Sequence, residues 1–292
     1  MRRSSTFGAT ETARAVGRRR LGAVLGAELL CAVLLVAGPQ VGPPVPAVAG
    51  APAGAVADAA GSAARDVALP DSRTARLIDL GAPGGSVLLD RIAAELPGAA
   101  GAVTAFWGPR WRRDVLIVVA GSAHQFATVG GGGIGIAATT SPDRITFAPG
   151  AVAMNSADLR TVLRHELFHY AARPDTAVDA PTWLTEGVAD FVGRAEDAES
   201  VTWAPAASSG RLPTDAELST PGPGRSLAYD RAWSFVSYVA DRYGIDGLRA
   251  LYLQAGGIGR TDVVTAVRNA LGVELPVVLA GWTHWHGASS TR

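Results

Sequence analysis

The chain has 292 residues, 48% of them hydrophobic and 18% charged, so it is long and apolar enough to bury one sizeable core. Basic and acidic residues balance at 26 each, which excludes the strongly basic composition typical of nucleic-acid-binding proteins. We therefore expect no nucleic-acid partner. The single cysteine, Cys31, excludes a disulfide within the chain.

The N-terminal segment has the composition of a targeting signal. Arginines at positions 14 and 18–20 precede an apolar run over residues 21–38, which is the order of the basic and hydrophobic regions in an export signal. The run is long enough for a cleaved signal peptide or for a membrane anchor, and both alternatives stay open. A small-x-small cleavage pattern ends at Ala49. Residues 1–49 are therefore interpreted as a signal peptide or an N-terminal membrane anchor.

Residues 50–64 are rich in alanine and glycine and have no periodicity, so they predict a flexible linker. The folded domain is then expected over residues 65–292, a usual size for a single domain. We expect this domain to be exported, either extracellular or anchored at the membrane outside the cytoplasm.

The first predicted elements are a helix and two strands. Apolar residues spaced as on one helix face predict an amphipathic helix over residues 85–96, ended by Pro97-Gly98. The stretches "DVLIVVAG" (114–121) and "RITFAPG" (144–150) read as strands. The four glycines at 130–133 lead into the strand-like "GIGIAATT" rather than into a helix, which excludes a dinucleotide-binding loop. They predict a hairpin or loop whose flanks approach a neighbour closely.

Helices dominate the second half of the chain. Helix-start residues at 155–158, apolar residues at helical spacing and Pro174 together predict a helix over residues 157–172. A second helix should begin near Thr182, and "LAYDRAWSFVSYVADRYG" predicts a third that ends at Gly244. The rest looks helical with short breaks. A small sheet followed by helices indicates an α+β fold.

The stretch "HELFH" places His165 and His169 four residues apart on a predicted helix, with Glu166 beside the first histidine. Residues four apart share one helix face, so both imidazoles can reach the same point. Imidazole is a common ligand of Zn²⁺, and an adjacent glutamate that is not a ligand can act as general base for metal-activated water. His-Glu-x-x-His on a helix therefore indicates one zinc ion, with Glu166 as the catalytic base.

A third protein ligand is expected, because catalytic zinc usually has three and leaves one position open. Glu186 follows His169 by 17 residues, which is enough for the chain to turn and return as a second helix. Asp190 lies one turn further along the same face and can accept a hydrogen bond from a ligand histidine, which would fix its tautomer. We expect Glu186 to be the third ligand and Asp190 to orient a histidine.

The stretches "HELFHY" and "WLTEGVADF" resemble the gluzincin metallopeptidases, in which His-Glu-x-x-His is followed by a glutamate on the next helix. The wider segment 115–253 resembles peptidase-MA-like bacterial proteins that are exported or attached to the membrane. The resemblance implies a small mixed β-sheet followed by a mainly helical zincin-like catalytic region, with the active-site helix between them. It also implies that an edge strand binds an extended peptide antiparallel, and "GIGIAATT" and "RITFAPG" are both candidates for this strand.

The resulting hypothesis is a zinc-dependent peptidase that hydrolyses peptide bonds with metal-activated water. Glu166 would be the general base and then the acid for the leaving amine. Gluzincins generally place a tyrosine or histidine beyond the third ligand to stabilise the oxyanion, and the resemblance points to Tyr229. A packing role for a half-buried Tyr229 is the alternative. The partner is a peptide or protein substrate, and aminopeptidase, endopeptidase and self-processing activities stay open.

Two other functions compete with the peptidase. The first is a catalytically silent binding or scaffold module at the cell surface, and it is disfavoured because such a module has no chemical need for Glu166. The second is a structural zinc site, which is usually closed by four residues and often includes cysteine. The expected domain contains no cysteine, which disfavours that site as well.

Overall fold

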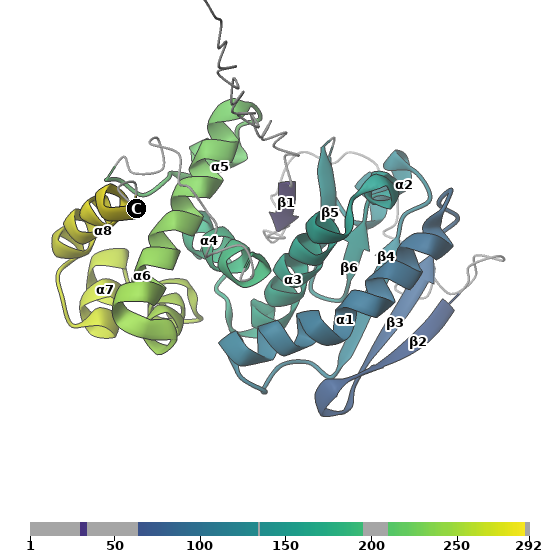
Figure 1. Ribbon diagram of the computed structural model, residues 1–292, viewed down its shortest axis with the longest axis horizontal. Coiled ribbons are helices and arrows are strands. Elements are labelled where there is room, and N and C mark those ends of the chain that lie inside the picture. The colour runs from purple at the N-terminus through teal and green to yellow at the C-terminus, as the bar shows by residue number, and fades with distance from the viewer. Residues whose placement is uncertain (1–29, 34–63, 134, 195–209, 290–292) are drawn as a thin grey trace, which may run out of the picture.

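The computed structural model describes residues 30–33, 64–133, 135–194 and 210–289. They form a mixed β-sheet with helices packed on it, followed by a largely helical C-terminal part (Figure 1). The helix that carries "HELFH" lies between these two parts. The predicted α+β fold class is confirmed. The cleavage pattern at Ala49 and nearly all of the predicted linker fall outside the described residues.

The sheet contains strands from both the start and the middle of the chain. They are β1 (Leu30–Val33), β2 (Ala64–Leu69), β3 (Arg73–Asp79), β4 (Asp114–Val119), β5 (Ile136–Thr140) and β6 (Ile145–Phe147), arranged in the order β1-β5-β6-β4-β3-β2. Strands β3, β4 and β6 are parallel, whereas β2 and β5 run antiparallel to β3 and β6. Residues 64–79 therefore belong to the same sheet as the rest of the fold.

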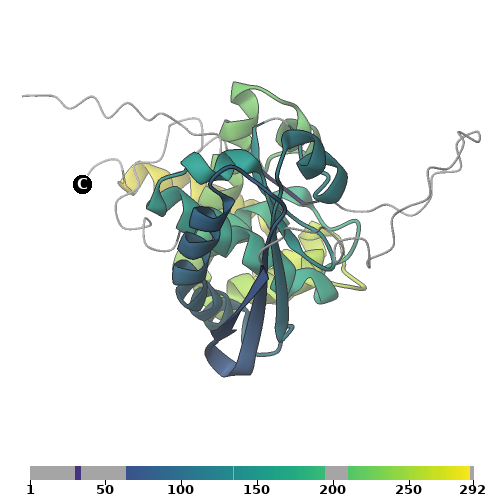
Figure 2. The ribbon, with the colours of Figure 1, turned by 90° about the vertical axis from the view of Figure 1, so that its right-hand side faces the viewer.

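The strands alternate between a core-facing side and an outer side. In β3, Ala75 and Leu77 are fully buried in the main hydrophobic core, while Arg76 between them is exposed; in β4, Ile117 and Val119 belong to this core and Val118 between them is buried outside it. This period of two is the expected pattern for a sheet that packs on helices with one face. Figure 2 shows α1 running along one side of the strands.

The helices are α1 (Gly85–Trp107), α2 (Ala123–Val129), α3 (Ser156–Ala172), α4 (Thr182–Gly193), α5 (Asp215–Ser219), α6 (Pro223–Gly256), α7 (Val263–Leu271) and α8 (Leu275–Ser289). Short 3₁₀ turns η2 (Pro70–Ser72), η3 (Pro149–Ala153) and η4 (Arg173–Asp175) join some of the elements. Helices α3 and α4 were both predicted, and each begins within one residue of its predicted start. Helix α2 was not predicted, because its seven residues carry too short an apolar pattern.

The predicted end of the first helix at Pro97-Gly98 is wrong. Helix α1 continues through Pro97 to Trp107. The continuation carries Ala100, Val103 and Phe106, which are buried on the same side as the first half. Burial of this apolar face outweighs the hydrogen bond that proline removes from a helix.

Two further sequence expectations are refined by the fold. Gly244 leaves the helical conformation with φ 79°, so it interrupts α6 as predicted, but a second helical segment follows at once and extends to Gly256. Neither edge-strand candidate lies at the edge of the described sheet. Strand β6, from "RITFAPG", lies between β5 and β4, and β5, from "GIGIAATT", lies between β6 and the four-residue β1.

Strand β1 falls within the segment interpreted as a signal peptide or anchor, and it pairs with β5 in parallel. Among the described residues, no single helix meets the length and hydropathy expected of a membrane span; α7 and the first part of α8 meet them only jointly, with a bend of 76° between them.

The packing of α4 against α6 generates a stability prediction at Gly187. A Cβ atom at this position would lie 2.8 Å from the carbonyl oxygen of Ala232, whereas a Cβ at Gly98 in α1 would meet nothing within 4 Å. We expect Gly187→Ala to lower the free energy of unfolding by about 1–3 kcal/mol, because backbone must move to accept the methyl group. The matched control Gly98→Ala should stabilise by up to about 1 kcal/mol. Urea unfolding with a metal chelator present measures both, and equal effects of the two variants would contradict this packing.

Candidate metal centre

Helix α3 positions His165, Glu166 and His169. The helix begins where the Asn155 side chain accepts a hydrogen bond from the backbone N–H of Asp158 at 2.9 Å, a typical N-cap. Two turns later the helix is enclosed on all sides, and both histidines and Glu166 are buried. Burial of three polar side chains within five residues is costly unless they have partners, which marks this part of α3 as a candidate site.

Helix α4 brings Glu186 and Asp190 to the same place. The chain turns after α3 through η4 and returns as α4, as the spacing predicted. Gly193 allows the two helices to approach closely, because a Cβ there would lie 3.0 Å from the Thr161 carbonyl oxygen and 3.5 Å from the Cβ of His165. Glu186 and Asp190 are both buried against α3. The predicted ligands from two helices are therefore brought together.

The three predicted ligand atoms converge on one point. The Nε2 atoms of His165 and His169 are 3.0 Å apart. The Glu186 carboxylate lies 3.4 Å from the Nε2 of His165 and 3.5 Å from the Nε2 of His169. The group is buried, and its ligand atoms all lie within 4.8 Å of one another. His165, His169 and Glu186 can therefore hold one metal ion.

The charge of the site calls for a cation. Oxygens Oε1 of Glu166 and Oε2 of Glu186 are buried and accept no hydrogen bond from any described residue. Burial raises the pKa of Glu186, but the nearby imidazoles of His169 and His165 outweigh it and lower this pKa to about 2. Glu186 is therefore ionised at neutral pH. Imidazoles that bind a metal ion are neutral, so a bound metal ion would take the place of the positive charge that the two rings otherwise provide to this carboxylate.

Asp190 orients His165 as the sequence predicted. Its Oδ1 lies 2.9 Å from the Nδ1 of His165, which leaves Nε2 of that ring directed at the metal point. The other oxygen, Oδ2, lies 3.5 Å from the guanidinium of Arg194, whose NH1 is 4.0 Å from Asp230 and whose guanidinium stacks on Trp233. Arg194 was missed from the sequence, although its position four residues after Asp190 is the helical spacing that would have indicated it.

Thr140 holds the predicted base Glu166. Its hydroxyl lies 2.5 Å from Oε2 of Glu166 and 3.0 Å from the Glu166 carbonyl oxygen, so its single proton can be donated to either. Thr140 is the last residue of β5 and is buried. The contact fixes one carboxylate oxygen and leaves Oε1 directed elsewhere. No sequence pattern indicates this pair, because the two residues are 26 positions apart on different elements.

Tyr229 lies in the first turns of α6, half-buried against the hydrophobic core. Its assignment to oxyanion stabilisation stays a prediction. His124, in α2, and His284, in α8, are exposed and do not belong to the buried metal-competent group.

No protein-family model and no curated protein matches this chain. Among solved structures, it is similar to an M1 zinc metallopeptidase from Deinococcus radiodurans, with a TM-score of 0.49 and 18% sequence identity over 76% of this chain and 50% of that chain. A two-domain M1 zinc metallopeptidase mutant bound to L-arginine gives a TM-score of 0.48 and 20% identity, again over 76% of this chain and 50% of the other. The chain thus spans about half the length of the solved structures it matches.

The contact between Asp190 and His165 generates a prediction for metal affinity. We expect Asp190→Asn to weaken Zn²⁺ binding by about 10- to 100-fold, because the amide cannot act as the anionic acceptor that fixes the His165 tautomer. Competition with a fluorescent chelator measures the dissociation constant. Asp66→Asn, which removes an exposed carboxylate in β2, is the charge-matched control and should bind Zn²⁺ as the unchanged protein does. Equal affinities for all three proteins would show that Asp190 does not support the site.

Proposed function

We propose that this protein is a zinc-dependent peptidase that hydrolyses peptide bonds with metal-activated water, with Glu166 as the general base. The observation that carries the proposal is the convergence of His165, His169 and Glu186 on one buried point beside Glu166, which has one oxygen held and one unpartnered. A zinc ion held only for structure would have no use for this fourth group.

The spacing of the ligand atoms suits zinc. With zinc–ligand bonds of about 2.0–2.1 Å in a tetrahedral arrangement, two ligand atoms lie about 3.3 Å apart. The two Nε2 atoms are 3.0 Å apart, and the Glu186 carboxylate lies 3.4 Å from that of His165 through Oε2 and 3.5 Å from that of His169 through Oε1. Two imidazoles and one carboxylate are also a usual donor set for a catalytic zinc with an open fourth position. This donor set supports zinc and one ion per chain.

The residues around the site supply the proton transfers. Zinc, when bound, lowers the pKa of a water molecule and polarises the substrate carbonyl. Oε1 of Glu166 would take a proton from the attacking water and then deliver it to the nitrogen of the leaving amine. Thr140 keeps the carboxylate in one orientation during both steps. Tyr229 would donate a hydrogen bond to the substrate oxygen as negative charge develops on it.

The side of β5 away from β6 pairs with β1, and an extended substrate that replaced β1 could pair there. Ala137 accepts a hydrogen bond from Ala148, and Ser141 donates one to Arg144, so these two residues direct their backbone groups toward the residues just after and just before β6. In an antiparallel ladder alternate residues face opposite sides, and Ala138 and Thr140 therefore direct theirs toward the other edge. A peptide paired there would lie beside Thr140 and hence beside Glu166.

Replacing the base and a ligand should separate chemistry from metal binding. We expect Glu166→Gln to retain about one zinc per chain and to lose peptide hydrolysis by about 100-fold or more, because the amide cannot take the proton. Glu186→Ala should lose both zinc and activity. Metal content by mass spectrometry and cleavage of a broad peptide library measure the two properties.

The same assay tests Tyr229. Tyr229→Phe removes only the hydroxyl, and we expect slower turnover with unchanged zinc content. Turnover equal to that of the unchanged protein would leave Tyr229 with a packing role only and would not affect the zinc chemistry. Equal hydrolysis by the unchanged protein and by Glu166→Gln would contradict the peptidase itself and would favour a silent binding module.

We also propose that the domain acts outside the cytoplasm, because residues 14–38 have the basic-then-apolar order of an export signal. Cell fractionation and N-terminal sequencing of the expressed chain measure this. Recovery from the medium with a new N-terminus near Gly50 would indicate a cleaved signal, and recovery from the membrane with the N-terminus retained would indicate an anchor. Recovery of the whole chain from the cytoplasm would contradict export.

A further inference from the structure

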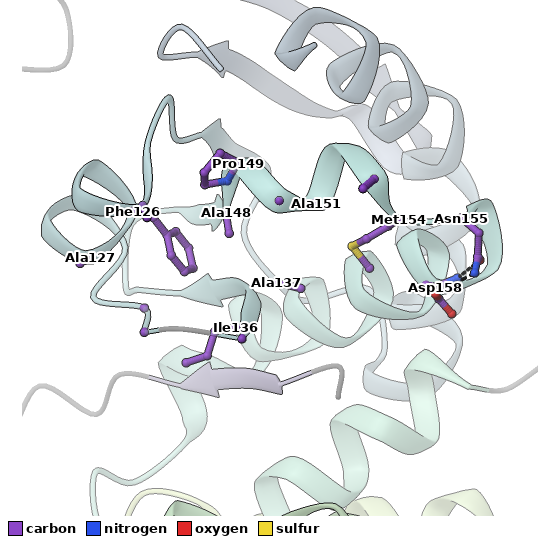
Figure 3. Close-up of a pocket in the computed structure, with 16 residues that line it drawn as sticks. Phe126, Ala127, Ile136, Ala137, Ala148, Pro149, Ala151, Met154, Asn155 and Asp158 are labelled. Carbon is purple, nitrogen blue, oxygen red and sulfur yellow. Dashed lines mark hydrogen bonds between the residues drawn. The ribbon is translucent and has the colours of Figure 1, made fainter. Parts of the chain in front are cut away.

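An apolar pocket lies at the other end of β5 from the metal centre (Figure 3). We propose that this pocket binds an apolar side chain of the peptide substrate, three or four residues from the bond that is cleaved. The proposal rests on the proposed peptidase function and adds a specificity determinant to it.

The pocket has the size and lining of a binding site for an apolar group. Its volume is about 730 Å³, within the usual range for ligand pockets. Phe126 of α2, Ile136 of β5 and Met154 contribute the large side chains, and most other lining residues are alanine, glycine or proline. The glycine-rich stretch closes one side, because Gly132 lies directly against the Phe126 ring, where a Cβ would be 2.1 Å from a ring atom. The small lining residues leave the space open.

The distance from the pocket to the site can be estimated along two elements, β5 and α3. Strand β5 contributes Ile136 to the pocket and Thr140 to Glu166, which is four residues, or about 13 Å of strand. Helix α3 contributes Asp158 to the pocket and Glu166 to the site, which is eight residues, or about 12 Å of helix. The two estimates agree. An extended peptide with its scissile bond beside Glu166 would thus reach the pocket with its third or fourth residue from that bond.

The edge of β5 already accepts an extended segment. Strand β1 pairs along it, with Leu30 opposite Ile136 and Val33 opposite Thr140 and a register shift after Leu30, and so spans the interval from the pocket to the site. A substrate strand would replace β1 over this interval. Antiparallel pairing is slightly more stable than the parallel pairing of β1, so we expect the substrate to run from Thr140 toward Ile136. The pocket would then take a residue on the C-terminal side of the scissile bond.

The pocket also has one charged group. Asp158 lies at its rim, half-buried, and its Oδ2 is 2.7 Å from the side-chain nitrogen of Asn155. A carboxylate beside an apolar cavity repels an acidic side chain, and the lining offers little polar surface to compensate. The inferred preference is therefore for leucine, methionine or phenylalanine, with aspartate and glutamate rejected.

The test is a peptide library with every cleavage site mapped by mass spectrometry. We expect large apolar residues three or four positions after the scissile bond to be favoured about tenfold over alanine, and acidic residues to be disfavoured. Ala127 is an exposed lining residue on α2. Ala127→Phe should fill the pocket and bring the ratio of cleavage with a large apolar residue to cleavage with alanine close to one. Thr128→Phe is the matched control, because it places the same side chain on the next exposed position, which does not line the pocket. It should keep both the preference and the activity.

A second measurement separates this proposal from the peptidase proposal. Glu166→Gln, alone and combined with Ala127→Phe, is titrated with fluorescent peptides. These peptides carry either leucine or alanine three or four positions after the expected scissile bond. Cleavage with no preference, or with a preference that Ala127→Phe leaves intact, would overturn the pocket and leave the peptidase. If no peptide is cleaved but leucine still binds about tenfold more tightly and Ala127→Phe removes the difference, the pocket stands and the peptidase fails. Absence of both cleavage and a binding difference would overturn both. A preference on the N-terminal side of the bond would support the pocket and reverse the strand direction.

Discussion

The structure depends on burying acidic side chains between helices α3 and α4. Glu166, Glu186 and Asp190 are all buried, and of these three only Asp190 lies within ion-pair distance of Arg194. Moving an unpaired carboxylate out of water is so costly that a fold keeps one only where a cation or a hydrogen-bond donor meets it. Here the two histidine rings turn their Nε2 atoms to the same point as Glu186. The arrangement can hold a cation.

Aromatic packing behind the site keeps this arrangement from relaxing. The ring of Phe168 in α3 meets the rings of Tyr252 and Trp107 edge to face, with centroids 5.6 and 5.7 Å apart, and so joins α3 to α6 and α1. Trp183 of α4 meets Phe235 of α6 in the same way at 5.4 Å. Gly187 and Gly193 let α4 approach α6 and α3 closely on its two sides. The ligands are therefore positioned by rigid neighbours before any metal binds, which limits the conformational entropy lost on binding.

Whether a feature of the site could be predicted from the sequence depends on how far apart along the chain its residues lie. The pairs His165–His169 and Glu186–Asp190 are local and helical, so spacing alone indicated them, and the structure brings both pairs together. Thr140 meets Glu166 through tertiary packing of β5 on α3, which leaves no periodic trace in the sequence. The order of strands, which places β1 rather than β5 or β6 at the edge, has the same origin. The predicted helix end at Pro97 was wrong because burial of the second half of α1 outweighs the local tendency of proline to end a helix.

Strand β5 links the chemistry to substrate selection. Its last residue contacts the proposed base, its first lines the apolar pocket, and between them its backbone faces an edge that an extended chain can join. Strand β5 has a fixed rise per residue, so a peptide paired with it would be aligned both with the pocket at its first residue and with Glu166 at its last. A side chain seated in the pocket would then set which peptide bond lies beside Glu166. Binding energy gained far from the reacting atoms would be used to position them, and selectivity and rate would depend on the same few hydrogen bonds along one edge.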